Sequence, residues 1–234
     1  ATALCRHLEA GELRVREVRH AATAFASMSF ADAALFGAIC DWMAPRVASC
    51  STGDLVSVAF ALAKAREAAG AAHTRLYAAM GPEILHRLRN NGVKARDASN
   101  LIYSFSEASA SSDQLLGALS EAVGRAPQSL NGQDLSLLVP NLGEEARHRP
   151  ELLNALAAQT ARCSATLSPR QLSRLMCGFA EAHASATNLW STLGHEAATR
   201  KSHFSPADVV RVLAGLNAAG VMEPGLLRTF WGQA

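Results

Sequence analysis

Apolar residues recur in this chain with a helical spacing, and that spacing is itself repeated at a nearly fixed interval. A row of acidic or amide residues marks the interval: Glu17, Asp54, Asp97, Asp134, Gln171 and Asp208. These markers are separated by 37, 43, 37, 37 and 37 residues. A constant period of this size is typical of solenoids built from stacked supersecondary units. The marker position therefore serves as offset zero in each repeat.

Each marker opens an amphipathic helix, here called helix A. Apolar residues occupy offsets −4, +1, +4, +5 and +8 in all six repeats, and the fifth repeat has Leu167, Leu172, Leu175, Met176 and Phe179 there. Offsets +1, +4, +5 and +8 lie on one stripe of an α-helix, because 3.6 residues make one turn. The pattern predicts that helix A buries this stripe.

The markers are predicted to cap helix A. Ser205-Pro206-Ala207-Asp208 combines an N-cap serine, a proline at the first helical position and an acid at the third, and Ser168 to Gln171 repeats this plan. Two further cap positions hold Ser51 and Asn131, whereas Arg14 and the segment 91–94 are poorer caps. Capping, and not acid–base catalysis, is the expected role of these carboxylates.

A second apolar stripe at offsets +18, +19 and +22 predicts helix B. Its members include Leu35, Phe36, Ile39, Leu115, Leu116, Leu119, Leu152, Leu153, Leu156, Leu189, Trp190, Leu193, Leu226, Leu227 and Phe230. Pro150 and Pro224 stand just before the stripe, where a helix start tolerates proline. The predicted fold is all-α, a single right-handed α-solenoid over residues 1–234. Its two-helix repeats span approximately 12–48, 49–91, 92–128, 129–165, 166–202 and 203–234.

The repeat that contains Asp54 is longer than the others by six residues. The extra residues lie between Lys64 and Asn91, and the pattern leaves open whether they lengthen helix A, the turn or helix B. An insertion within a repeat usually projects on one face of the array. This repeat is therefore a candidate contact site.

Composition restricts the function classes. The chain has 234 residues, 49% of them hydrophobic, and a formal net charge of +2. No linker interrupts the period, so one array is expected. No uncharged apolar run reaches about eighteen residues, so no membrane span is predicted. Residues 1–9 lack the apolar core of a signal peptide, and Leu4 and Leu8 fit the tail of a preceding helix B.

Motifs for catalysis or metal binding are missing or incomplete. The five cysteines, which are Cys5, Cys40, Cys50, Cys163 and Cys177, include no C-x-x-C pair and predict free thiols in a reducing compartment. His195-Glu196 begins like a zinc-protease helix, but Thr199 stands where the second histidine is required. No phosphate-binding loop or nucleophile elbow occurs. We expect no enzyme, no metal and no cofactor.

The side of helix A away from its buried stripe carries the candidate binding residues. Offsets +2, +3, +6 and +7 are predicted to face solvent, and offset −1 adds a row of arginines in alternate repeats. The candidate RNA contacts are Arg16, Arg19, His20, Arg96, Asn100, Tyr103, Arg170, Arg174 and Arg211. Tyr103 and Phe60 have rings that could stack on bases, although Phe60 could equally contact the next helix.

Two interpretations of these columns stand side by side. A repeat protein that recognises single-stranded RNA base by base requires different hydrogen-bonding side chains at one repeated position. A solvent-exposed face without a function shows the same variation. Strong RNA binders are usually clearly basic, because phosphate neutralisation drives their affinity. The net charge of +2 is modest. A surface that docks another protein therefore explains these columns as well as an RNA-binding surface does.

The helix A sequences resemble a known class of repeats. Residues 204–216 and 167–180 are similar to helix A of the heptatricopeptide and octotricopeptide repeats, related to those of FAST-kinase-like and RAP-domain organellar proteins, as are residues 56–63. The resemblance covers about residues 12–234, and the period favours the heptatricopeptide type. No RAP-like module follows the repeats, so nuclease activity is not expected. Phe25, Phe105 and Phe179 stand where related repeats carry tryptophan.

The resemblance implies an α-solenoid in a mitochondrion, or alternatively a plastid, that binds RNA within a ribosome or another ribonucleoprotein. The alternative is a non-catalytic scaffold subunit of a large organellar complex. The expected partners are ribosomal RNA, an organellar transcript or protein subunits. Because a solenoid needs polar caps at its ends, the apolar C-terminal residues Leu226, Leu227, Phe230 and Trp231 predict that a partner covers this end.

Overall fold

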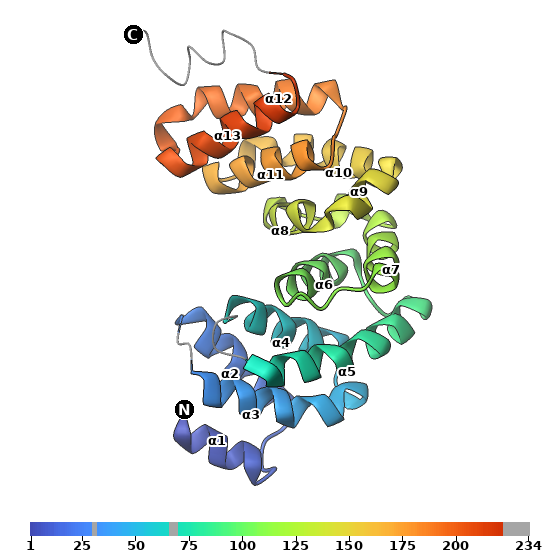
Figure 1. Ribbon diagram of the computed structural model, residues 1–234, viewed down its shortest axis with the longest axis vertical. Helices are drawn as coiled ribbons and strands as arrows, with labels where there is room; N and C mark the ends of the chain where they lie inside the picture. The colour runs from blue at the N-terminus through green and yellow to red at the C-terminus, as the bar shows by residue number, and fades with distance from the viewer. Residues whose placement is uncertain (30–31, 66–69, 222–234) are drawn as a thin grey trace. The chain divides into compact units, whose positions relative to one another are not determined.

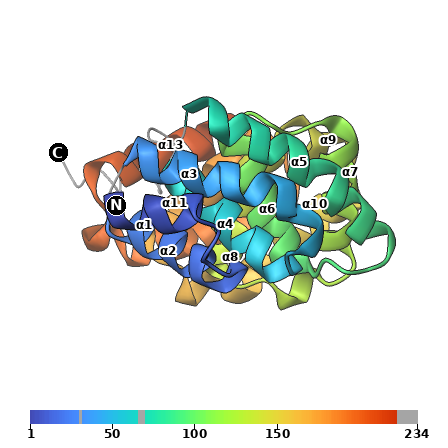
Figure 2. The same ribbon diagram turned by 90° about the horizontal axis from the view of Figure 1, so that it is seen from below.

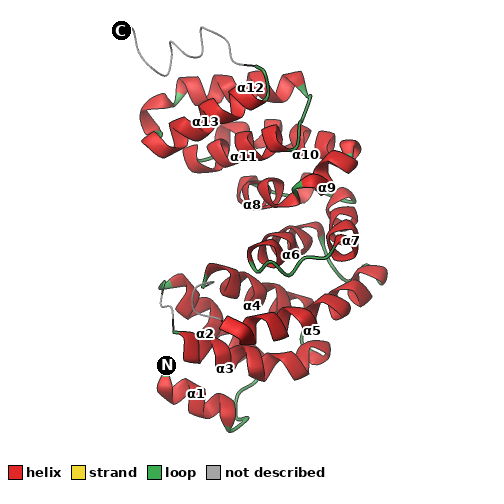
Figure 3. Cartoon of the chain, in the orientation of Figure 1, coloured by secondary structure: helices red, strands yellow, loops and turns green. Residues whose placement is uncertain are grey.

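The computed structural model of this chain describes residues 1–29, 32–65 and 70–221. Helix is the only regular secondary structure in these ranges (Figures 1 and 3), which confirms the all-α part of the prediction. No helix there combines the length and hydrophobicity that a membrane span requires. The chain divides into two compact units, Ala1–Ala122 and Val123–Ala234.

Unit 1 contains two layers of helices. Its elements are α1 (Thr2–Glu9), α2 (Val15–Ser27), α3 (Ala33–Met43), α4 (Thr52–Lys64), α5 (Gly70–Arg89), α6 (Ala95–Glu107) and most of α7 (Asp113–Gly124). The A helices α2, α4 and α6 pack in that order, and α1, α3 and α5 pack likewise. In Figure 2, α3 and α5 are drawn above α2 and α4, so the two layers are seen from the side. Helix α1 occupies a helix B position, as Leu4 and Leu8 suggested.

Unit 2 repeats the same packing. Its elements are α8 (Gly132–Leu142), α9 (Glu144–His148), α10 (Pro150–Cys163), α11 (Pro169–Glu181), α12 (Thr187–Thr199) and α13 (Pro206–Ala218). The A helices α8, α11 and α13 pack in order, and α10 packs on α12. The predicted helix B around Leu226 and Phe230, with Pro224, lies outside the described residues, and so does the expectation of a covered C-terminal end.

The predicted apolar columns form the core. All members at offsets −4, +1, +4, +5 and +8 are buried, apart from four that are half-buried: Leu13, Ala21, Phe25 and Val209. Phe105 and Phe179, the large residues of two repeats, are 1% and 0% exposed. The five cysteines are free thiols, and Cys40 and Cys50 are buried. Burial raises the pKa of the Cys40 thiol to about 12.

The predicted caps are present. The side chains of Ser51, Asn131, Ser168 and Ser205 accept from the backbone amide of the marker three residues later. The marker also reaches back, since Gln171 Oε1 accepts from the Ser168 amide at 2.8 Å. At the poorly capped start of α2, Glu17 performs this function alone by accepting from the Arg14 amide at 2.7 Å.

The markers have a second role that the sequence did not reveal. The Asp208 carboxylate of α13 accepts from Ser173 Oγ of α11 at 2.9 Å, and Asp54 Oδ1 of α4 lies 3.4 Å from Arg19 Nε of α2. In both pairs, offset zero of one helix A meets offset +2 of the helix A before it. Hydrogen bonds from Ser205, and also from Ser173, hold the pKa of Asp208 below its ordinary value. The marker therefore joins neighbouring repeats as well as capping its own helix.

Adjacent A helices approach closely at offset +7. A Cβ atom on Gly178 of α11 would lie 2.9 Å from the backbone nitrogen of Pro140 on α8. A Cβ atom on Gly215 of α13 would lie 3.0 Å from the carbonyl carbon of Met176 on α11. Only glycine fits such contacts without displacing a neighbouring backbone. The expectation that offset +7 faces solvent is therefore wrong for these repeats.

The six-residue insertion lengthens helix B. In five repeats helix B begins at offset +16, at residues Ala33, Gly70, Asp113, Pro150 and Thr187. Helix α4 has 13 residues, as have α2, α6, α11 and α13. Helix α5 has 20 residues, whereas α3, α7, α10 and α12 have 11 to 14. Neither helix A nor the start of helix B is shifted, which resolves the three alternatives.

Arg87 on the lengthened helix α5 holds the segment that leads into α4. Its guanidinium group donates to the carbonyl oxygens of Cys50 at 2.7 Å and Val47 at 3.3 Å. It also donates to Thr52 Oγ1 at 3.1 Å and to Glu83 Oε1 at 2.7 Å. The Arg87 side chain is only 14% exposed. One side chain thus donates to the Cys50 carbonyl next to a helix start and adds a second donor to the Val47 carbonyl, which also accepts from the Cys50 amide at 3.3 Å.

Unit 2 contains equivalent contacts. Arg200 on α12 donates to the carbonyl oxygens of Leu167 at 2.7 Å and Ser164 at 3.2 Å. In the preceding repeat, Gln159 Nε2 on α10 donates to the Leu130 carbonyl at 2.7 Å. Cys50, Leu167 and Leu130 all stand at offset −4. Fixing this carbonyl from helix B is therefore a recurring feature of the repeats.

Acidification is expected to weaken unit 1 through His73. This residue of α5 is 8% exposed, its Nε2 atom has no hydrogen-bond partner in the described ranges, and its ring contacts Tyr77 edge-on at 4.7 Å. Burial lowers the pKa of His73 below 6.5. Below pH 6.5 the unfolded chain therefore binds more protons than the folded chain. The free energy of unfolding then decreases as the pH is lowered, by at most about 2 kcal/mol at pH 5. Urea titrations of the wild type and His73→Phe would measure this difference, and equal pH dependence would contradict it.

Candidate nucleic-acid interface

The outer face of the A layer in unit 1 consists of three parallel rows of side chains. Offsets −1, +3, +6 and +10 lie on one stripe of each helix, opposite the buried stripe. The rows are Arg16, His20, Thr23 and Ser27 on α2; Gly53, Ser57, Phe60 and Lys64 on α4; and Arg96, Asn100, Tyr103 and Glu107 on α6. All are exposed or half-buried. Five of the six candidate residues in unit 1 belong to these rows.

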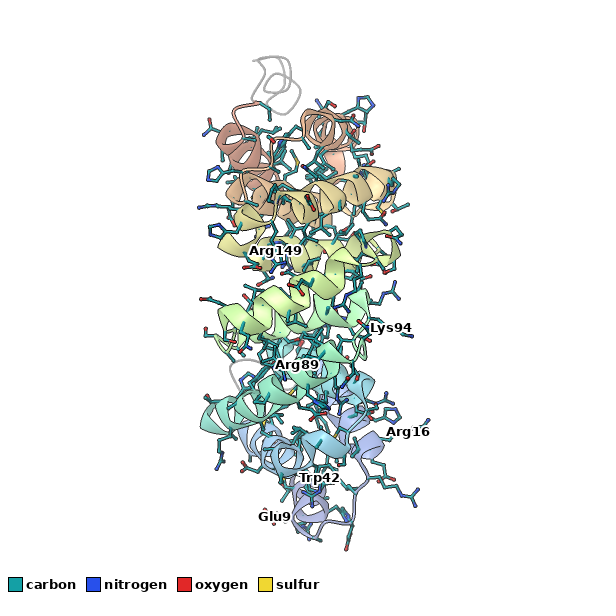
Figure 4. All side chains as sticks on the ribbon, turned by 90° about the vertical axis from the view of Figure 1, so that its right-hand side faces the viewer. Glu9, Arg16, Trp42, Arg89, Lys94 and Arg149 are labelled. Atoms are coloured by element: carbon teal, nitrogen blue, oxygen red, sulfur yellow. The ribbon has the colours of Figure 1, made fainter. Side chains whose placement is uncertain are left out.

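The N-terminal ends of these helices carry cations. Arg16 and Arg96 are exposed in the first turns of α2 and α6, and Lys94 is exposed at the N-cap of α6. Arg16 and Lys94 make no side-chain hydrogen bond or ion pair with any described residue. Figure 4 shows both side chains projecting at the same edge of unit 1, whereas Arg89 of α5 lies away from that edge. Helix N-termini add partial positive charge here, so this edge suits an anion.

Arg19 is half-buried between two helices and does not lie on the solvent-exposed face as predicted. The columns at offset +2 were expected to face solvent, but Val56, Ser99, Ser136 and Ser173 are buried, at 6% exposure or less. The physical reason is that each helix A packs against a neighbour in its own layer as well as against helix B. The Arg19 side chain is 28% exposed, and its Nη2 atom donates to His20 Nε2 at 2.7 Å. Arg19 mainly joins α2 to Asp54 of α4, and His20 remains on the exposed row.

Two aromatic rings lie on the outer face of α4 and α6, the face that also carries Asn100. The rings of Phe60 and Tyr103 join α4 to α6, with centroids 5.4 Å apart and planes inclined at 50°. The Lys64 ammonium lies 4.9 Å from the centroid of the Phe60 ring. Phe60 thus does contact the next helix. Both rings are half-buried, so part of this aromatic surface is open to solvent.

Unit 2 carries three candidate arginines on α11 and α13. Arg170 is exposed and Arg174 is half-buried one turn later, and neither guanidinium group has a hydrogen-bond or ion-pair partner among the described residues. Arg211 is exposed but forms an ion pair with Asp208, Nη1 to Oδ1, at 2.9 Å. Arg170 and Arg174 are therefore free to bind an anion, whereas Arg211 already has a carboxylate partner.

Lys64 belongs to this face but was missed from the sequence. It completes the −1, +3, +6, +10 stripe of α4, and the helical period of 3.6 residues is the signal that places it there. The predicted row at offset −1 is present in unit 1 as Arg16 and Arg96, and in unit 2 as Arg170. Asn100 and Tyr103 share the face with Arg96 on one helix.

The incomplete zinc motif and the groove beside α1 offer no clear metal or ligand site among the described residues. Glu196, from the incomplete zinc motif, pairs with Arg200 at 3.1 Å. No cluster of three or more histidine, cysteine or acidic side chains suitable for a metal occurs in the described ranges. A groove of about 540 Å³ between α1 and α3 is lined by Glu9 and Trp42 among others. The Arg46 guanidinium lies 4.4 Å over the Trp42 ring, so this face of the ring is already occupied.

Neither a protein-family model nor a curated protein sequence matches this chain. The resemblance to heptatricopeptide repeats therefore rests on the period and pattern of the sequence.

Proposed function

We propose that this chain binds single-stranded RNA through the outer face of its A helices. One observation carries the proposal: the guanidinium groups of Arg16, Arg170 and Arg174 have no partner among the described residues and lie on the outer stripe of their A helices. In unit 1 the same stripe also presents imidazole, amide and aromatic groups. Arginine binds phosphate strongly because its planar donors match the phosphate oxygens. The cations lie at the N-terminal edge of the helices, where they can bind the phosphates of a single strand. The groups towards the middle of each helix can then contact the RNA bases.

The remaining candidates would contact the bases. Asn100 offers an amide and His20 an imidazole for hydrogen bonds to base edges, and the exposed part of the Tyr103 ring offers a stacking surface. Proteins recognise unpaired RNA bases by these two kinds of contact. Lys64, held over the Phe60 ring, adds a cation beside the aromatic pair.

Binding is expected to weaken with salt and with loss of the free arginines. We would titrate a fluorescently labelled single-stranded RNA with the protein across a salt series. Arg16→Ala and Arg170→Ala are each expected to weaken binding about fivefold, since an ion pair at an exposed position is worth up to about 1 kcal/mol. Each should flatten the slope of log affinity against log salt by about 0.7, the contribution of one phosphate contact on a single strand.

Arg89→Ala is the matched control for these variants. Arg89 is exposed on helix B of unit 1 and, like Arg16, has no side-chain partner in the described ranges. The Arg89→Ala substitution removes the same charge from a different face, so the affinity for RNA should stay unchanged. An equal loss in all three variants would show a non-specific effect of charge, and binding that ignores salt would contradict the proposal.

A protein scaffold is the second candidate function. It is favoured by the low net charge of +2 and by the apolar side chains exposed at Met28 and Val210. The right-handed solenoid of six repeats, membership of the heptatricopeptide class and a mitochondrial or plastid location stay predictions. Purification from the native source would decide between RNA and protein partners.

A further inference from the structure

Within each unit, the contacts that the marker residues and the offset +7 glycines make between neighbouring A helices use the same two faces. The rear face of one helix, around offsets +2, +5 and +6, receives the front face of the next, around offsets 0, +7 and +11. Ser173 of α11 and Asp208 of α13 meet in this way, as do Met176 and Gly215. The pair formed by Arg19 and Asp54 repeats the arrangement between α2 and α4.

The rear face of α13 has no neighbour among the described residues. Val210 at its offset +2 is 65% exposed, although the equivalent Ser173 is completely buried under α13. Ala214 and Asn217 of the same face are also exposed. This face carries a valine and an alanine where a partner helix would lie.

The front face of α2 is open in the same way. Met28 at offset +11 is 64% exposed, whereas the alanines at this offset in two interior repeats, Ala65 and Ala182, are 8% and 4% exposed. Ala24 at offset +7 is exposed, and it is small, like the residues that allow close approach at +7 in α11 and α13. Helix α2 thus keeps the features of a front face.

We propose that the rear face of α13 in one molecule packs on the front face of α2 in a second molecule, head to tail. The two faces are complementary because the protein joins its own repeats with the same pair of surfaces. Met28 and Val210 are the large hydrophobic side chains that the described residues expose, and one lies on each face. Such a contact is heterologous, so it builds chains or rings of molecules and not a two-fold dimer.

The charges next to these faces allow the contact. Glu17 on the front face already accepts from the Arg14 amide at 2.7 Å, and Arg211 beside the rear face already pairs with Asp208 at 2.9 Å. The centre of the contact is apolar and small, involving one helix from each molecule. Association should therefore be weak, with a dissociation constant in the micromolar range or above.

Sedimentation velocity without RNA, from about 1 µM to about 200 µM, would test this contact. The wild-type sedimentation coefficient is expected to rise with concentration. Val210→Glu and Met28→Glu should each weaken association at least about tenfold, since either buries a carboxylate in an apolar contact. Asn188→Glu adds the same charge at an exposed position of α12 and should behave as the wild type.

Mixing the two variants tests the head-to-tail geometry itself. The Val210→Glu chain keeps an open front face and the Met28→Glu chain keeps an open rear face, so an equimolar mixture should form a one-to-one dimer and nothing larger. Val210→Ser and Met28→Ser should act in the same direction, and circular dichroism would confirm that each variant is folded. A wild type that stays monomeric, or a mixture that does not dimerise, would overturn the proposal.

Discussion

Replacing Gly178 with alanine is expected to destabilise the fold by about 2 kcal/mol, although alanine is the better helix former. The new Cβ atom would lie 2.9 Å from the nitrogen and 3.0 Å from the Cα atom of Pro140. These are backbone atoms of α8, so no side-chain rotation relieves the clash and the two helices must separate. Overpacking of this kind costs about 1 to 3 kcal/mol, which exceeds the gain in helix propensity of up to about 1 kcal/mol.

Gly37→Ala is the matched control for this prediction. Gly37 also lies inside a helix, α3, but a Cβ atom there would meet nothing within 4 Å. The substitution should therefore stabilise the protein by about 0.5 to 1 kcal/mol. Chemical denaturation would measure both free energies of unfolding. Stabilisation of similar size in the two variants would mean that α8 and α11 are not in close contact.

Much of the local structure could be predicted from the sequence because its causes lie within one helix. The spacing of Ser168 and Gln171 defines a capping box, and the structure contains that box. The buried stripe of helix A follows from the period of 3.6 residues alone. Interactions over three or four residues leave a pattern that a single sequence displays.

The sides of helix A could not be predicted in this way. Offset +2 holds serine in three repeats, and a serine column looks solvent-exposed when only helix B is considered. Burial of these serines is tolerated because their hydroxyl groups find nearby acceptors, as Ser136 Oγ does by donating to the Gln133 carbonyl at 3.0 Å. The neighbour that buries them lies one repeat away, so no spacing within the helix reveals it.

The same limit affects the candidate site. Exposure of Arg16, Arg96 and Arg170 followed from their place opposite the buried stripe. The partners of Arg19 and Arg211 did not, because a charged side chain looks free until the carboxylate beside it is placed. Periodicity defines the face of a helix, and only the packing of helices shows which charges on that face remain unpaired.

Arg87→Ala is expected to destabilise unit 1 by about 3 kcal/mol. The Arg87 guanidinium donates to the carbonyl oxygens of Cys50 and Val47, which lie 37 and 40 positions before Arg87 in the chain. Its removal leaves the Cys50 carbonyl and the Glu83 carboxylate, whose side chain is 20% exposed, without this donor, and leaves the Val47 carbonyl with only the Cys50 amide. Breaking a largely buried charge interaction costs about 3 to 5 kcal/mol. The lower end applies here, because water still reaches part of the pair.

Three further variants separate this mechanism from a simple loss of charge. Arg87→Lys keeps the charge but cannot donate in several directions at once, so it should recover less than half of the lost free energy. Arg89→Ala removes an exposed arginine two residues away and should change stability by less than about 0.5 kcal/mol. Arg200→Ala, in unit 2, should match Arg87→Ala because Arg200 makes the equivalent contacts to Leu167 and Ser164. Urea denaturation would measure all four variants. If Arg87→Lys were as stable as the wild type, the positive charge alone, and not the several hydrogen bonds of the guanidinium group, would stabilise the start of α4.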